Sequence, residues 1–283
     1  MRYGPWAPAP APWHGSSKVS VLSSQTEALL LPSGLIQSEA LDRRLLRELP
    51  LTQEPRLQAE SHSQIQLWAA GLVMLPVFLQ APWVRLNPFS ACLFTVVLLA
   101  VAIPLGWQES KGRHQAGALL LGFCGSWLAG SLFWGWLRAH PSWHLPVEAI
   151  ALPLALAGLG SRWRLGCAFY LSSLVGTALT DLAMALTGVM RFWPAVVQAP
   201  LNEATPLLHS AATSLQQPLA IGVIALLATL ILSSARWMHR RGRSGVIHAD
   251  SWAVAASVLI TTVMVDGLFL VLALIHPSLS GLI

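Results

Sequence analysis

Three acidic residues lie inside long apolar stretches, where a carboxyl group could carry a proton, bind a cation or pair with a base. They are Glu148, Asp181 and Asp266. A charge at the centre of a bilayer costs at least about 2.5 to 3.5 kcal/mol, so such acids usually face other helices. The helical rise places Asp181 and Asp266 roughly 15 Å below one end of their helices, with Glu148 within about two turns of the same end. The three acids are therefore predicted to converge on one polar pocket.

Two threonines precede two of these acids by one helical turn. Thr177 comes four residues before Asp181, and Thr262 comes four residues before Asp266. This spacing places each hydroxyl on the helix face of the carboxyl, so the threonines are predicted to orient or hydrogen-bond the acids. Two interpretations stay open. The acids either bond across helices to lock a bundle, or they couple protons or cations or bind a polar ligand.

Basic and imidazole groups gather just before Glu148: Arg138, His140 and His144. A spacing of four between His140, His144 and Glu148 would suit a metal ion on a continuous helix. Pro141 and Pro146 instead predict a turn and then a helix that starts near Pro146, with Glu148 in its first turn. A salt bridge between Arg138 and Glu148 explains the same residues more simply, so Arg138 is predicted to be the counter-charge. We predict no metal ion and no cofactor.

The elements that must position these groups are long apolar runs. The 283 residues are 54% hydrophobic and 10% charged, whereas soluble domains carry about a quarter charged residues. About 20 apolar residues span a bilayer as a helix. Seven runs have roughly this length: 64–83, 88–107, 115–137, 145–160, 165–190, 218–238 and 251–275. They predict an all-α, polytopic transmembrane helix bundle of about seven spans, in which the fourth run is the shortest.

The basic residues report the orientation of these spans. The seven-span count puts all of the 17 Lys and Arg residues on the side of the N-terminus except Arg85, Arg138 and Arg191. Cytoplasmic loops carry the excess of Lys and Arg, so the N-terminus is predicted to be cytoplasmic and the C-terminus to lie on the opposite side. The basic residues flank the apolar runs and form no stripe, so the lipid bilayer is a predicted partner and nucleic acid is not.

The first 63 residues are predicted to form a separate cytoplasmic tail, and residues 64–283 the transmembrane domain. The tail is rich in Pro, Ala and Ser and cannot bury a core, so it is predicted to be largely disordered. Within it, Leu41, Leu45 and Leu49 recur at helical spacing and predict a short amphipathic helix from about Glu39 to Leu49.

Small residues recur at intervals of four in two of the predicted helices. Gly122, Ser126 and Gly130 lie in the third helix, and Gly176 lies in the fifth. Stripes of small residues let helix backbones approach closely, so these positions are predicted to be helix-packing sites. A substrate groove is the alternative.

Several strings combine unusual residues in order: LPVFLQAP at 75–82, SWLAGS at 126–131, WGWLR at 134–138, HLPVEAI at 144–150 and GTALTDL at 176–182. Over about residues 65–235 the chain resembles an uncharacterised family of multi-pass membrane proteins, a domain of unknown function, from cyanobacteria. The resemblance implies a plasma or thylakoid membrane location and makes a link to photosynthetic membranes plausible. It carries no catalytic residue over.

Three functional hypotheses follow. The preferred one is a non-enzymatic membrane protein that binds or transports a small polar or amphiphilic solute, with the three acids lining the site. The rival is an assembly or scaffold factor for larger membrane-protein complexes, such as photosynthetic ones. An intramembrane enzyme acting on a lipid or pigment precursor comes third, since its acid and base residues would look the same in sequence. Hydrolase, metalloprotease, ATPase and dinucleotide motifs are absent from the sequence. The only lysines, Lys18 and Lys111, lie outside the spans, which excludes a retinal Schiff base.

Overall fold

The computed structural model describes residues 54–243 and 248–275, and the side chains of these residues from Ser63 onward except that of Leu201. The predicted amphipathic helix at Glu39–Leu49 lies outside the described residues. The described part begins with α2 (Glu54–Leu75), whose first residues fall within the segment predicted as tail. Whether residues 1–63 form a separate domain therefore stays a prediction.

Helices make up all the regular structure in the described ranges, and six of them are long and apolar enough to cross a membrane. The first runs from Ser63 to Leu86 and joins α2 through a π-helical turn, η1 (Pro76–Gln80), to α3 (Ala81–Leu86). The others are α4 (Pro88–Gly106), α5 (Lys111–Leu132) with its π-helical turn η2 (Phe133–Leu137), α8 (Arg164–Leu186), α11 (Pro218–Arg243) and α12 (Ala249–Ile275). The predicted all-α transmembrane bundle is confirmed.

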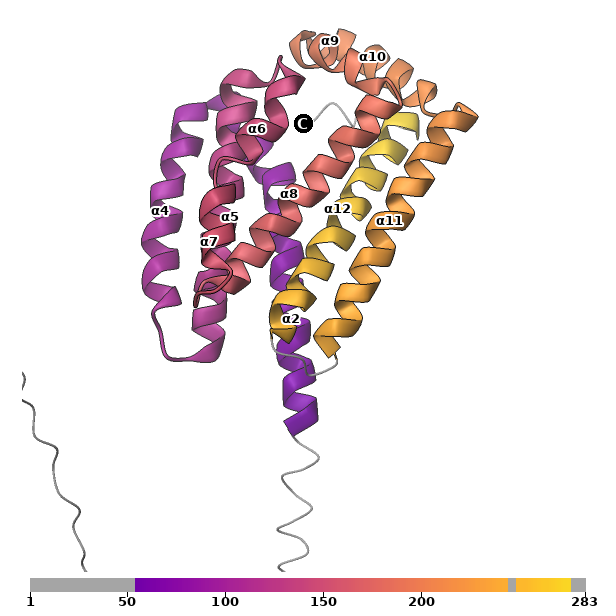
Figure 1. The fold of residues 1–283 in the computed structure, drawn as a ribbon. Coiled ribbons are helices and arrows are strands. Elements are labelled where there is room, and N and C mark those ends of the chain that lie inside the picture. The colour runs from indigo at the N-terminus through magenta and orange to yellow at the C-terminus, as the bar shows by residue number, and fades with distance from the viewer. Residues whose placement is uncertain (1–53, 244–247, 276–283) are drawn as a thin grey trace, which may run out of the picture. The chain divides into compact units, whose positions relative to one another are not determined.

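The fourth predicted span is not one helix. A 3-10 turn, η3 (Pro141–Trp143), leads into α6 (His144–Glu148), and three residues then separate α6 from α7 (Leu152–Gly158). Glu148 is the last residue of α6, so its predicted place in a first helical turn is wrong. Figure 1 shows that α6 and α7, which follow α5 and precede α8 in the chain, together still carry the chain from one end of the bundle to the other. The later helices therefore keep the directions that seven crossings require.

The two ends of the bundle differ. At one end, α9 (Trp193–Gln198) and α10 (Leu201–Ser214) cross over the helix ends between α8 and α11 (Figure 1), and we name this the α10 end. At the other, three connections meet, because Arg164 bonds His248 and Lys111 lies 3.5 Å from Asp250. We name this the basic end.

Glycines set the closest approach between α5 and α8. A Cβ atom added to Gly122 would lie 2.1 Å from the carbonyl oxygen of Gly166, and one added to Gly166 would lie 2.0 Å from that of Ala118. Of the other predicted packing positions, Gly130 faces the Gln80 side chain and Gly176 faces Thr262, whereas Ser126 is half-buried. Close backbone contact of this kind excludes lipid from between the helices.

Candidate functional site

An imidazole–carboxyl pair joins α6 to α8 near the α10 end. The Nδ1 atom of His144 lies 2.9 Å from Oδ1 and 3.0 Å from Oδ2 of Asp181. Both side chains are only 12% exposed. Hydrogen bonds and ion pairs strengthen where water is excluded, so this pair holds the short α6 against α8.

A second carboxyl, Asp266 of α12, contacts a hydroxyl of α8. The Oγ1 atom of Thr180 lies 2.6 Å from Oδ2 of Asp266 and 3.1 Å from the carbonyl oxygen of Gly176. A hydroxyl has one hydrogen, so it donates to one of these oxygens at a time. Either Thr180 donates to an ionised Asp266, or a protonated Asp266 donates to Thr180 and Thr180 donates to Gly176. The contact therefore accommodates a proton on Asp266 or the lack of one.

Thr177 and Thr262, which were predicted to orient or hydrogen-bond Asp181 and Asp266, make no hydrogen bond to these acids in the described residues. The hydroxyl of Thr262 donates to the carbonyl oxygen of Val258, 3.1 Å away, in its own helix. Thr177 is half-buried, and within the described ranges its hydroxyl makes no hydrogen bond to Asp181. The partner of Asp266 is instead Thr180, which lies on a neighbouring helix.

Asp181 connects the three acids. Its partner His144 lies on the same short helix as Glu148, and its neighbour in the chain, Thr180, contacts Asp266 of α12. Because α8 ends at Leu186, Asp181 lies about 8 Å below the end of its helix, nearer the surface than predicted. The structure thus places the three acids in one cluster from three elements. In the described part of the chain, no group of three or more His, Cys, Asp or Glu residues is arranged to hold a metal ion.

Three aromatic rings pack around the imidazole of His144. The imidazole centroid lies 4.4 Å from the ring of Phe133, 5.4 Å from that of Trp193 and 6.2 Å from that of Trp134. Trp134 and Trp193 stack on each other with centroids 5.5 Å apart. The cluster therefore combines carboxyl groups with a wall of apolar ring surface.

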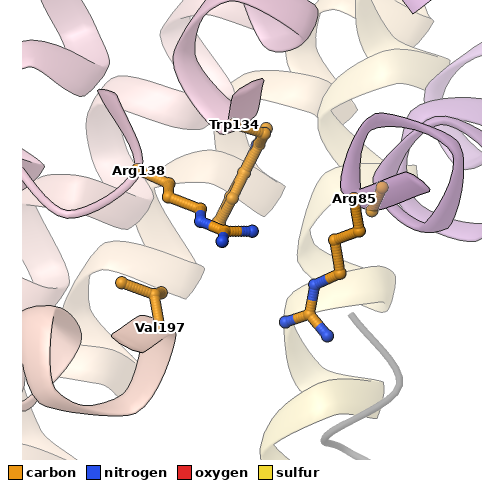
Figure 2. A pocket seen from close by; sticks show the side chains of 5 residues that line it. Arg85, Trp134, Arg138 and Val197 are labelled. Carbon is orange, nitrogen blue, oxygen red and sulfur yellow. The ribbon is translucent and has the colours of Figure 1, made fainter. Parts of the chain in front are cut away.

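The predicted salt bridge between Arg138 and Glu148 is not found among the described residues, which corrects the role given to Arg138. Its side chain instead lines a small open pocket together with Ala81, Arg85, Trp134 and Val197 (Figure 2). The indole of Trp193 donates to the backbone carbonyl of Arg138 at 2.7 Å, which fixes the chain after η2.

Sequence reasoning missed two polar side chains that hold the site's elements. Gln80, at the end of η1, is 2% exposed and donates to the carbonyl of Trp127 and to the hydroxyl of Ser131. Tyr170 of α8 bonds the backbone between α6 and α7. The amide of Gln80 and the phenol of Tyr170 stand out as isolated polar groups within apolar runs, and this was the available signal. The sequence of each run does not show which residue the polar group bonds.

A family model described as "Protein of unknown function (DUF3120)" matches residues 69–274. The match includes nearly all of α12, beyond the stretch over which the sequence resemblance was drawn. No curated protein and no solved structure matches the chain significantly.

Proposed function

The chain belongs to the DUF3120 family, and we propose that it binds or transports a small polar or amphiphilic solute in the membrane. The observation that carries the proposal is the pair of contacts, His144 with Asp181 and Thr180 with Asp266, that bring the acids of α6, α8 and α12 near one another inside an apolar bundle. Acids in such surroundings are rare and usually mark a ligand site or an ion pathway.

The neighbours of the cluster indicate the kind of solute. Asp181 and Asp266 offer oxygens that can accept hydrogen bonds from a hydroxyl or an amine, and Thr180 can donate or accept. The stacked rings of Trp134 and Trp193, which are half-buried, offer apolar surface to the rest of the same molecule. A solute with a polar head and a compact apolar body matches both features.

We also propose the orientation that the basic residues favour. Most of the described Lys and Arg residues lie near the basic end: Lys111, Arg113, Arg162, Arg164, Arg240, Arg241 and Arg243. The positive-inside rule then places the basic end, and with it the N-terminus, in the cytoplasm. The carboxyl cluster lies in the half of the bundle that faces away from it. A cyanobacterial plasma or thylakoid membrane, implied by the resemblance, is part of this proposal.

Binding to the purified full chain tests the proposed site. Thermal unfolding in detergent is measured with a panel of small hydroxylated, amine and amphiphilic solutes, and the most stabilising solute is then used for uptake into proteoliposomes. We expect Asp181→Asn and Asp266→Asn to weaken binding about ten-fold or more, because each replaces a carboxyl group with an amide that can no longer carry a charge. Asp250→Asn, at the basic end, is the matched control and should bind normally. Normal binding by both cluster variants would rule out the site.

The scaffold hypothesis is the competing proposal and predicts a different result. A scaffold would be recovered in stoichiometric amounts with a larger membrane complex after mild detergent extraction, and no solute in the panel would stabilise it. Recovery as a free protein, with a solute response lost in the two Asp variants, supports solute binding instead. An enzyme acting on a lipid or pigment precursor would bind its solute at the same acids and also convert it.

A further inference from the structure

Two arginines from different helices point into the same pocket at the α10 end. Arg85 lies on α3, directly after the π-helical turn η1, and Arg138 follows the π-helical turn η2. The turn η2 packs closely against the chain just after Arg85, since a Cβ atom added to Gly135 in η2 would lie 2.8 Å from Pro88, the first residue of α4. Figure 2 shows the two guanidinium groups facing the same space, with Trp134 and Val197 beside Arg138.

The pocket has positive charge without a counter-charge. Neither Arg85 nor Arg138 forms an ion pair with a carboxylate in the part of the chain that the structure describes, and the two like charges interact with each other. Its remaining lining residues, Ala81, Trp134 and Val197, carry no charge. This is notable because the α10 end has few basic residues. Two like charges brought together in a pocket are stabilised when an anion binds between them.

We propose that the Arg85–Arg138 pocket binds a phosphate group. A guanidinium presents a planar fork of N–H donors that pairs with two oxygens at once. A carboxylate offers two oxygens, which one fork satisfies, whereas a phosphate offers enough oxygens for two forks on different sides. Trp134 and Val197 form the apolar wall beside the anion.

The phosphate can come from a lipid headgroup or from a free phosphate compound. Close to Arg85 in the chain, Leu86 is 87% exposed and Phe89 is 73% exposed, and Phe89 packs edge-on against Trp136 with centroids 5.1 Å apart. These side chains provide surface for acyl chains beside the two guanidinium groups. Both sources share the same recognition chemistry, and the experiment separates them. The inference does not depend on the carboxyl cluster.

The test uses full-length protein in a detergent that contains no phosphate. Thermal unfolding is recorded with sodium phosphate, with sodium chloride at matched ionic strength, and with a short-chain phosphatidylglycerol. We expect phosphate or the lipid to raise the unfolding temperature where chloride does not. In Arg85→Gln and Arg138→Gln the dissociation constant should rise about ten-fold or more, since each variant removes charge-assisted hydrogen bonds.

Arg191→Gln is the matched control. Arg191 lies near the same end, with its guanidinium 4.9 Å from the ring centre of Phe192, and it does not line the pocket. A response to inorganic phosphate assigns a free phosphate ligand, and a response to the lipid alone assigns a headgroup. Should Arg138→Gln fail to fold, Arg85→Gln carries the test, because the Arg85 side chain is exposed. No stabilisation of the natural protein, or equal stabilisation of the Arg85→Gln variant, would overturn the proposal.

Discussion

The phenol hydroxyl of Tyr170 donates a hydrogen bond to the carbonyl oxygen of Glu148, across the break that separates α6 from α7. The phenol oxygen of Tyr170 in turn accepts a hydrogen bond from the backbone N–H of Ala151 at 3.1 Å. An unpaired backbone group within the hydrocarbon core costs several kcal/mol. One side chain of α8 therefore satisfies two backbone groups that the interrupted helix leaves unpaired.

Replacement of Tyr170 by Phe should destabilise the bundle by about 1 to 3 kcal/mol, because it leaves both backbone groups without their partner. Denaturant unfolding in detergent gives the free energy, and hydrogen exchange should show faster exchange at Ala151. Ser210→Ala is the control, since Ser210 is exposed and bonds only a carbonyl of its own helix. Equal exchange at Ala151 in the variant and the natural protein would contradict the assigned role.

The sequence predicted the six continuous helices well, because the length of an apolar run and its polar flanks directly reflect bilayer thickness. The run at 145–160 was predicted as a span for the same reason. An apolar run need not form one unbroken helix, however. Residues 149–151 interrupt the helix although none of them is polar or proline.

The acids were predicted to converge from their depths in the helices, but the predicted depth of Asp181 was wrong because α8 ends at Leu186. Their partners were not predictable, because i and i+4 spacing identifies a shared face within one helix, whereas the partner of Asp266 is Thr180 on another helix. Arg138 was assigned to Glu148 from closeness in sequence, but the turn after η2 directs it toward α3. Contacts between two helices depend on how the helices are aligned relative to each other, and the sequence of either helix alone does not show this alignment.

Thr180→Val should weaken the contact between α8 and α12, because it removes the hydroxyl that bonds Asp266. Hydrogen bonds between membrane helices contribute about 0.6 to 1.7 kcal/mol, so a loss of this size is expected in unfolding free energy. Thr177→Val is a matched control on the same helix, since its hydroxyl bonds neither Asp181 nor Asp266 in the described structure. An equal loss of unfolding free energy in both variants would show that the hydrogen bond between Thr180 and Asp266 does not contribute to stability.

Thr95→Val is expected to be neutral or to stabilise the protein by up to about 1 kcal/mol. The hydroxyl of Thr95 is buried and has no hydrogen-bond partner in the described residues. The usual acceptor for a helical threonine is the carbonyl four residues earlier, but the indole of Trp127 donates to that oxygen, at Ala91, at 2.8 Å. Valine keeps the shape and removes the unpaired group.

Thermal unfolding measures the effect of Thr95→Val, with Thr261→Val as the comparison. Thr261 is also buried, but its hydroxyl donates to the carbonyl of Ser257 at 2.8 Å. Its replacement should therefore be the more damaging of the two. A clear loss of stability in Thr95→Val alone would mean that its hydroxyl has a partner in the membrane.

Gln80→Leu should lower stability by about 1 to 3 kcal/mol, because the buried amide joins η1 to α5 through the Trp127 carbonyl and Ser131. A double-mutant cycle with Ser131→Ala isolates the bond between the two side chains, and a coupling energy of about 0.5 kcal/mol or more is expected. Gln198→Leu, at an exposed position, is the control. Additive effects of Gln80→Leu and Ser131→Ala would exclude a direct bond.

Gly166→Ala should destabilise the protein by about 1 to 3 kcal/mol, since the added methyl group would overlap the backbone oxygen of Ala118 and neither backbone can move cheaply. Gly222→Ala is the matched control in α11, because nothing lies within 4 Å of its added Cβ atom. There the better helix propensity of alanine should leave stability unchanged or raise it by up to about 1 kcal/mol. The difference between the two variants in unfolding free energy therefore measures how closely α5 and α8 approach, and equal effects would mean that these backbones lie farther apart.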